Sequence, residues 1–255
     1  MPVHDRRHRR RRGADHVLRG GGPEGRHLLG ELRGARSVRP DVRRLRKSEG
    51  SRVTERWAGK SWATLGDSIT AANGYQPLVA AALGFGKVDN YGKSGCPLTA
   101  GSDRDHGATV HVGLGMEPAY DCVTIFAGTN DYRLNMPPGA DGERDIRTFR
   151  GAYVTLVESI LSRNPACRLS LWTPLQRDKD GYDHERANEI GHRLLDYADA
   201  IREIGAAYAL PVLDLYTESG FNKLTLDALT SDRLHPNEAG HRRIAQMASA
   251  FLSRL

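Results

Sequence analysis

Four short segments, far apart in the chain, carry side chains suited to nucleophilic catalysis. They are GDSIT at 66–70, NYGKSGCP at 90–97, AGTNDY at 127–132 and TSDRLHPNEAGH at 230–241. A serine hydroxyl becomes a strong nucleophile when a histidine removes its proton and a carboxylate orients that histidine. Hydrogen-bond donors must also receive the negative charge that develops on the substrate. The four segments contain all of these groups, and each also has an ordinary structural interpretation.

The first segment offers Ser68 as the nucleophile. Asp67 and Ser68 are equally common as caps at the start of a helix, so this segment alone favours a cap. The chain contains no G-x-S-x-G sequence. That absence excludes the nucleophile elbow of the α/β-hydrolases.

The second and third segments offer donors for a developing oxyanion. Gly92 and Gly95 are either simple turn residues or positions where a backbone N–H faces the site without obstruction by a side chain. Ser94 and Cys96 lie beside them and are rival nucleophiles. The amide group of Asn130 ends an apolar run, where it can serve as a loop residue or as an oxyanion donor.

The fourth segment places Asp232 three residues before His235, just ahead of a helix predicted to start at Pro236. A carboxylate at this spacing can cap the helix, or it can accept from Nδ1 of the histidine and leave Nε2 free as a base. A second histidine, His241, lies on the helix and is interpreted as a surface or packing residue. A metal-dependent phosphodiesterase using Asp67, Asp131, Asp232 and His235 is a weaker alternative.

Parallel strands alternating with helices would bring these segments together. Short apolar runs bounded by Gly or Pro predict strands at 61–66, 88–92, 122–128, 168–174 and 211–216. Amphipathic or apolar stretches predict helices at 75–83, 146–163, 185–208 and 237–255. The fold class predicted is therefore α/β, a three-layer α/β/α sandwich with a five-stranded parallel sheet in the flavodoxin-like order 2-1-3-4-5. In such a sheet, ligands bind beyond the carboxyl ends of the strands.

The charge of the chain is unevenly distributed. Residues 1–50 contain 14 Arg and one Lys against six acidic residues, a net charge of +9, whereas the whole chain carries +6 and the remainder therefore −3. The leader also lacks Ile, Phe, Tyr, Trp and Cys. We therefore predict a disordered leader at 1–52 and one catalytic domain at 53–255. Two alternatives are nucleic-acid binding through RRHRRRR and a true translation start at Val53, which would make the leader non-native.

Other features restrict the class of protein. No run approaches the roughly 18 apolar residues of a membrane span, and no secretory signal is visible, so the expected location is cytoplasmic. The three cysteines form no C-x-x-C pair, which argues against a zinc cluster and a disulfide framework. We expect no metal or organic cofactor, and the sequence leaves the oligomeric state open.

The four segments, in this order and with this spacing, resemble the SGNH hydrolases, also called GDSL esterases. The resemblance covers about residues 57–255, with GDSIT in block one, NYGKSG in block two, GTND in block three and SDRLHPNEAGH in block five. It implies Ser68 as nucleophile, His235 as base and Asp232 as the group that orients it. It also implies an oxyanion hole formed by the N–H groups of Ser68 and Gly95 and by the side chain of Asn130. The leader has no counterpart in the family pattern.

The substrate is less well defined by the sequence. Two linkers, 132–145 and 175–185, are expected to wall the site with charged residues and with Tyr132 and Tyr182. This composition favours a short acyl ester of a polar alcohol, for example an acetylated sugar stacked on a tyrosine, over a long-chain lipid. The alternatives are a lysophospholipase or thioesterase of the same family and a non-catalytic flavodoxin-like binding module.

Overall fold

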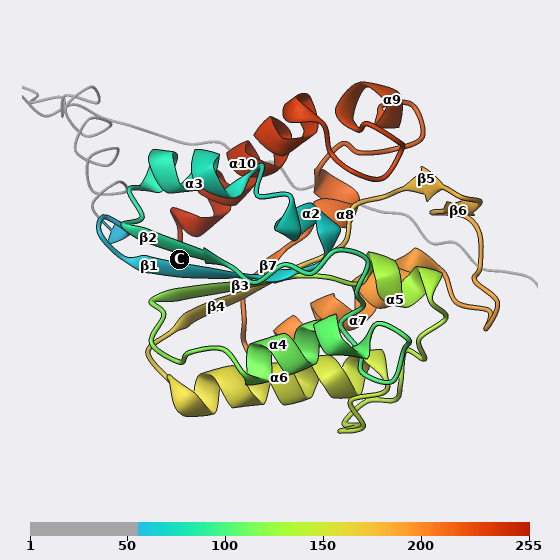
Figure 1. Cartoon of the computed structure of the whole chain (residues 1–255), viewed down its shortest axis with the longest axis horizontal. Coiled ribbons are helices and arrows are strands. Elements are labelled where there is room, and N and C mark those ends of the chain that lie inside the picture. The colour runs from blue at the N-terminus through green and yellow to red at the C-terminus, as the bar shows by residue number, and fades with distance from the viewer. Residues whose placement is uncertain (1–55) are drawn as a thin grey trace, which may run out of the picture. The chain divides into compact units, whose positions relative to one another are not determined.

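The computed structural model describes residues 56–255, so the predictions made for the leader lie outside the described residues. Five parallel strands form the central sheet in the order β2-β1-β3-β4-β7 (Figure 1). They are β1 (Ser61–Gly66), β2 (Lys87–Asn90), β3 (Cys122–Phe126), β4 (Arg168–Trp172) and β7 (Val212–Leu213). The predicted fold class, strand number and strand order are confirmed.

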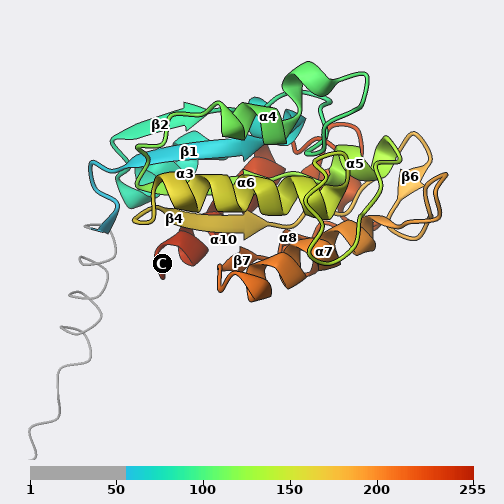
Figure 2. The ribbon, with the colours of Figure 1, turned by 90° about the horizontal axis from the view of Figure 1, so that it is seen from below.

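Helices cover both faces of this sheet (Figures 1 and 2). One face carries α3 (Gln76–Leu83) and α10 (Glu238–Leu252), and the other carries α4 (Thr109–Leu114), α6 (Phe149–Arg163) and α7 (Leu194–Ala207). Short helices directly follow three of the strands: α2 (Ser68–Ala71) after β1, α5 (Thr129–Arg133) after β3 and α8 (Leu215–Glu218) after β7. A further short helix, α9 (Leu226–Leu229), lies between α8 and α10. The remaining elements are a 3-10 turn, η1 (Asp105–Gly107), and a small hairpin of β5 (Asp178–Lys179) and β6 (Tyr182–Asp183).

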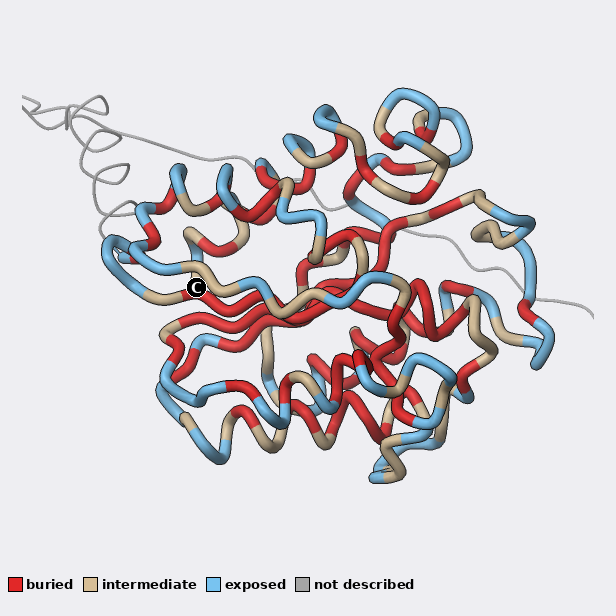
Figure 3. The backbone as a smooth tube through the Cα atoms, viewed as in Figure 1, coloured by how far each residue is buried: buried red, intermediate tan, exposed pale blue. Residues whose placement is uncertain are grey.

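Each inner strand supplies side chains to two cores, because successive residues of a strand point to opposite faces. In β1, Trp62 joins the core beneath α3 and α10, whereas Ala63 and Leu65 join the core beneath α4, α6 and α7. Strands β1, β3 and β4 are almost wholly buried, as Figure 3 shows. Burial on both faces explains why these strands read as continuous apolar runs in the sequence.

The helix predicted at 185–208 is wrong in its first part, because α7 begins at Leu194. The Asp183 carboxylate accepts hydrogen bonds from the backbone N–H groups of Glu185 and Arg186, both at 2.7 Å. Such side-chain bonds to the backbone compete with helix formation. Gly191 then adopts a φ of +87°, and Ile190, predicted on the buried face, is 44% exposed.

The strand predicted at 211–216 is also too long, since β7 pairs only through Val212 and Leu213 among the described residues. The Asp214 side chain caps the next helix by accepting from the N–H of Thr217. This cap turns the chain into α8 and ends the strand. The predicted helices at 75–83, 146–163 and 237–255 are confirmed with small shifts at their ends.

Candidate active site

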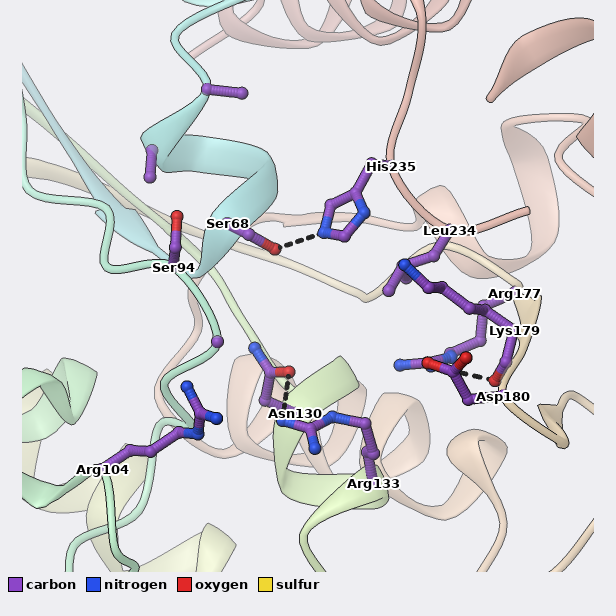
Figure 4. Close-up of a pocket in the computed structure, with 13 residues that line it drawn as sticks. Ser68, Ser94, Arg104, Asn130, Arg133, Arg177, Lys179, Asp180, Leu234 and His235 are labelled. Carbon is purple, nitrogen blue, oxygen red and sulfur yellow. Dashed lines mark hydrogen bonds between the residues drawn. The ribbon is translucent and has the colours of Figure 1, made fainter. Parts of the chain in front are cut away.

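Ser68 lies at the start of α2, directly after β1. Asp67 caps this helix, because its Oδ1 accepts from the N–H of Ile69 at 2.9 Å. The Ser68 side chain is therefore not used as a cap. Its Oγ lies 2.9 Å from Nε2 of His235, which comes from the segment before α10 (Figure 4).

His235 is held by a carboxylate three residues earlier. Nδ1 of His235 lies 2.8 Å from Oδ2 of Asp232, and Oδ1 of Asp232 accepts from the backbone N–H of His235 at 2.8 Å. Helix α10 is capped by Asn237, whose Oδ1 accepts from the N–H of Gly240. The competing interpretation of Asp232 as the helix cap is therefore wrong. Residues 68, 235 and 232 form a continuous hydrogen-bonded chain.

Lys179 is a fourth member of this cluster, and sequence analysis missed it. Its Nζ donates to Oδ2 of Asp232 at 2.5 Å. Burial raises the pKa of Asp232, but the hydrogen bonds from Lys179 and His235 outweigh that effect and hold the pKa well below its usual value. The carboxylate therefore stays ionised beside the histidine. No local pattern marks Lys179, which reaches Asp232 only because the hairpin of β5 and β6 folds back over the site.

Gly95 and Asn130 line the same cavity as Ser68 and His235. Gly95 has a φ of +72°, a conformation that favours glycine. One N–H of Asn130 donates to the carbonyl of Cys96 at 3.0 Å, which leaves the second N–H of the amide group unused by that bond. Gly92 is instead packed against α2, where an added Cβ would lie 2.3 Å from the backbone nitrogen of Ala71.

In the part of the chain that the structure describes, the rival nucleophiles have no comparable partner. Cys96 is buried, its Sγ faces the carbonyl of Ser94 at 3.6 Å, and burial raises the pKa of its thiol. Ser94 lines the cavity. Among residues 56–255, however, Ser68 is the only serine whose hydroxyl forms a hydrogen bond with a histidine ring, that of His235. The geometry therefore separates Ser68 from both alternatives.

The acidic residues of the metal-dependent alternative do not form a metal site. Asp131 is fully buried and accepts hydrogen bonds from the N–H groups of Leu98 and Thr99 and from the Thr99 hydroxyl. Asp67 is committed to its cap. In the part of the chain that the structure describes, no group of three His, Cys, Asp or Glu side chains is placed to hold a metal ion.

Burial shifts the pKa of two further titratable groups near the site. Burial raises the pKa of Asp67 to about 6, an effect that the hydrogen bond from Ile69 opposes and the nearby Asp131 reinforces. His241 packs its ring 6.4 Å from that of Tyr75 and against Gly74, and burial lowers its pKa. His241 is thus a packing residue, one of the two roles predicted for it.

The cavity in front of Ser68 has a volume of about 630 Å³. The residues that line it are Ser68, Ala71, Ala72, Ser94, Gly95, Arg104, Asn130, Arg133, Arg177, Lys179, Asp180, Leu234 and His235. The expected wall at 175–185 is present, whereas the linker 132–145 contributes only Arg133 to this lining. Arg104, from the segment between β2 and β3, was not expected.

The predicted tyrosines are not part of this lining. Tyr132 is fully buried, and its hydroxyl donates to the carbonyls of Asp183 and Arg186. Tyr182 packs edge-on against Tyr132, with 5.5 Å between ring centroids. Both rings therefore anchor the hairpin of β5 and β6, and the prediction that they wall the site is wrong.

The comparisons with known proteins agree with this architecture. The model of the GDSL-like lipase/acylhydrolase family matches residues 64–243. A solved protein of Lactobacillus plantarum is 31% identical, with a TM-score of 0.69 over 77% of this chain and 98% of its own. A lipase/acylhydrolase of Enterococcus faecalis is 28% identical, with a TM-score of 0.55 over 76% of this chain and 96% of its own. An acetyl xylan esterase, 21% identical, shares the fold with a TM-score of 0.53 over 74% of this chain and 98% of its own. The comparison with curated proteins finds no match.

Proposed function

This chain belongs to the GDSL-like lipase/acylhydrolase family, and from that premise we propose that it is a serine esterase that cleaves carboxylic esters through an acyl-enzyme on Ser68. The observation that carries the proposal is the hydrogen-bonded chain from Ser68 Oγ to His235 Nε2, at 2.9 Å, and from His235 Nδ1 to Asp232, at 2.8 Å. Each contact joins the atoms that a nucleophile, a base and an orienting carboxylate must use.

In the proposed reaction, Ser68 Oγ attacks the ester carbonyl while its proton passes to Nε2 of His235. Asp232 stabilises the imidazolium through Nδ1. The N–H groups of Ser68 and Gly95 and the free N–H of Asn130 receive the charge on the carbonyl oxygen. His235 then protonates the departing alcohol. A water molecule, deprotonated by the same histidine, releases the acid from Ser68.

The substrate we propose is a short-chain acyl ester, such as an acetyl ester, of a carbohydrate or another polar alcohol. Ala71, Ala72 and Leu234 are the main apolar side chains in the lining, and the other residues are mostly polar or charged. A long acyl chain requires a continuous apolar surface. A lysophospholipase or thioesterase of the same family remains the alternative, and activity that rises with acyl length would favour it.

Substitution Ser68→Ala tests the catalytic proposal. We expect kcat for 4-nitrophenyl acetate hydrolysis to fall by several orders of magnitude, because the hydroxyl that forms the acyl-enzyme is gone. Labelling of the protein by a serine-directed fluorophosphonate should be lost in parallel. Labelling that persists at another residue would refute the role of Ser68. Absence of esterase activity in the unmodified protein would instead favour the non-catalytic binding module.

A further inference from the structure

The wall of the cavity is strongly basic, although the chain after residue 50 is acidic overall. Arg104, Arg133, Arg177 and Lys179 line the cavity together with a single acidic residue, Asp180. They come from three separate segments of the chain, which meet at the carboxyl edge of the sheet. Figure 4 shows the guanidinium groups of Arg104 and Arg133 beside Asn130, on the side of the cavity opposite Ser68 and His235.

Within residues 56–255, three of these four cations have no acidic partner. Lys179 pairs with Asp232. Among residues 56–255, no carboxylate oxygen lies within 4.0 Å of a guanidinium nitrogen of Arg104, Arg133 or Arg177. Asp180 is exposed and forms no ion pair with any residue of 56–255. A cluster of unpaired like charges is unfavourable on its own and becomes favourable when an anion occupies it.

Arg177 adds a buried positive charge to the lining of the cavity. It is fully buried, yet its guanidinium donates only to the Thr129 hydroxyl at 3.1 Å and to the Lys179 carbonyl at 3.3 Å among the described groups. Its buried Nε has no hydrogen-bond partner there. A buried cation without a counter-ion is costly to maintain. Its charge is therefore available to an anion in the cavity.

Arg104 and Arg133 lie beside the groups assigned above to the oxyanion hole. A Cβ added to Gly95 would lie 2.7 Å from a terminal nitrogen of Arg104. Arg133 donates to Oδ1 of Asn130 at 3.4 Å. An anionic group held by these two arginines would therefore be close to the ester bond that Ser68 attacks.

We propose that this cavity selects esters that carry a negatively charged group, such as a carboxylate, phosphate or sulfate, near the scissile bond. Arg104 and Arg133 bind the anion directly, and Arg177 reinforces the field. This proposal rests on the esterase function and narrows its substrate class from polar alcohols in general to anionic esters. Lys179 is assigned to Asp232 and not to the substrate.

Two pairs of matched esters distinguish where the charge lies. Mono-4-nitrophenyl adipate against 4-nitrophenyl hexanoate places the anion on the acyl side. Sodium 4-acetoxybenzoate against its methyl ester places it on the alcohol side. For each pair, kcat/KM is measured at low salt and corrected for the uncatalysed rate. We expect the charged ester to be preferred about tenfold in at least one pair, the size expected for a charge-assisted contact. That preference should decline when salt is added.

Variants Arg104→Gln and Arg133→Gln test the assignment of the preference to these residues. Each should lower the charged-to-neutral ratio of kcat/KM about tenfold for the preferred pair. Arg168→Gln is the matched control, because Arg168 is exposed at the opposite end of the sheet, at the start of β4. Its ratio should equal that of the unmodified protein. Circular dichroism confirms that each variant is folded.

The outcomes separate this proposal from the esterase function. Ser68-dependent hydrolysis of all four esters with no preference for charge, or a ratio unchanged in both arginine variants, would overturn anion selection and leave the esterase intact. If the unmodified protein hydrolyses none of the four esters faster than Ser68→Ala does, both anion selection and the esterase function are overturned.

Discussion

At the scale of single residues, helix capping and the hydrogen bonds of the site are made by different side chains that stand close together in the sequence. Asp67 caps α2, which leaves Ser68 free to meet His235. Asn237 caps α10, which leaves Asp232 free to orient His235. In both places a capping residue and a site residue stand close together, and local sequence rules cannot assign the roles. Ser68 and His235 are 167 residues apart in the sequence, so only the short distance between them in space identifies Ser68 as the partner of the histidine.

Asp67 gives a prediction about stability and pH. Burial raises its pKa from the usual 3.8 to about 6 in the folded protein. Between these pH values the folded state binds more protons than the unfolded state, so the free energy of unfolding falls as pH rises and levels off above pH 6. Asp67→Asn keeps an oxygen for the cap but cannot ionise. As pH rises through this window, the unmodified protein loses stability and the variant does not. We therefore expect the free energy of unfolding of Asp67→Asn, relative to that of the unmodified protein, to increase by up to about 3 kcal/mol.

Urea unfolding at a series of pH values from about 4 to about 7 measures this difference. A difference that does not change with pH would show that Asp67 ionises normally in the folded protein.

At the scale of elements, one buried carboxylate fixes the loop that follows β2 against the helix that follows β3. Asp131, in α5, accepts from the N–H groups of Leu98 and Thr99, and these residues come shortly after Gly95 in the chain. The same helix carries Asn130. The two elements that supply the proposed oxyanion donors are therefore joined by hydrogen bonds behind the cavity.

Substitution Asp131→Asn should loosen this connection. An amide offers one acceptor oxygen where the carboxylate has two, and its NH₂ group would face backbone N–H donors in a fully buried place. We expect a loss of about 2–4 kcal/mol in the free energy of unfolding, together with a lower kcat. Asp103→Asn is the control, because Asp103 is exposed and within the described residues forms no ion pair. A stability equal to that of this control would contradict the role given to Asp131.

At the scale of the whole molecule, the sequence predicts the sheet well and the walls of the site poorly. Strands β1, β3 and β4 are buried on both faces, so their apolar runs are visible without any tertiary information. The cavity wall depends instead on loops. Arg104 and Lys179 reach the site because the loop held by Asp131 and the hairpin anchored by Tyr132 bring them there. Contacts of this kind leave no periodic pattern in the chain.

The two cores described for the fold have very different aromatic contents, and this gives the molecule two separate spectroscopic reporters. All three tryptophans, Trp57, Trp62 and Trp172, lie in the core beneath α3 and α10, with Tyr75 as their only tyrosine among the described residues. Of the other eight tyrosines, five are buried in the core beneath α4, α6 and α7, and three are partly buried and pack against it. Tryptophan emission therefore reports one side of the sheet, and tyrosine absorbance reports mainly the other.

Because one sheet supplies side chains to both cores, we expect the two signals to change at the same urea concentration. Separate midpoints would mean that the helices on one face detach before the sheet unfolds. The same pair of signals would also show which face responds when an ester enters the cavity.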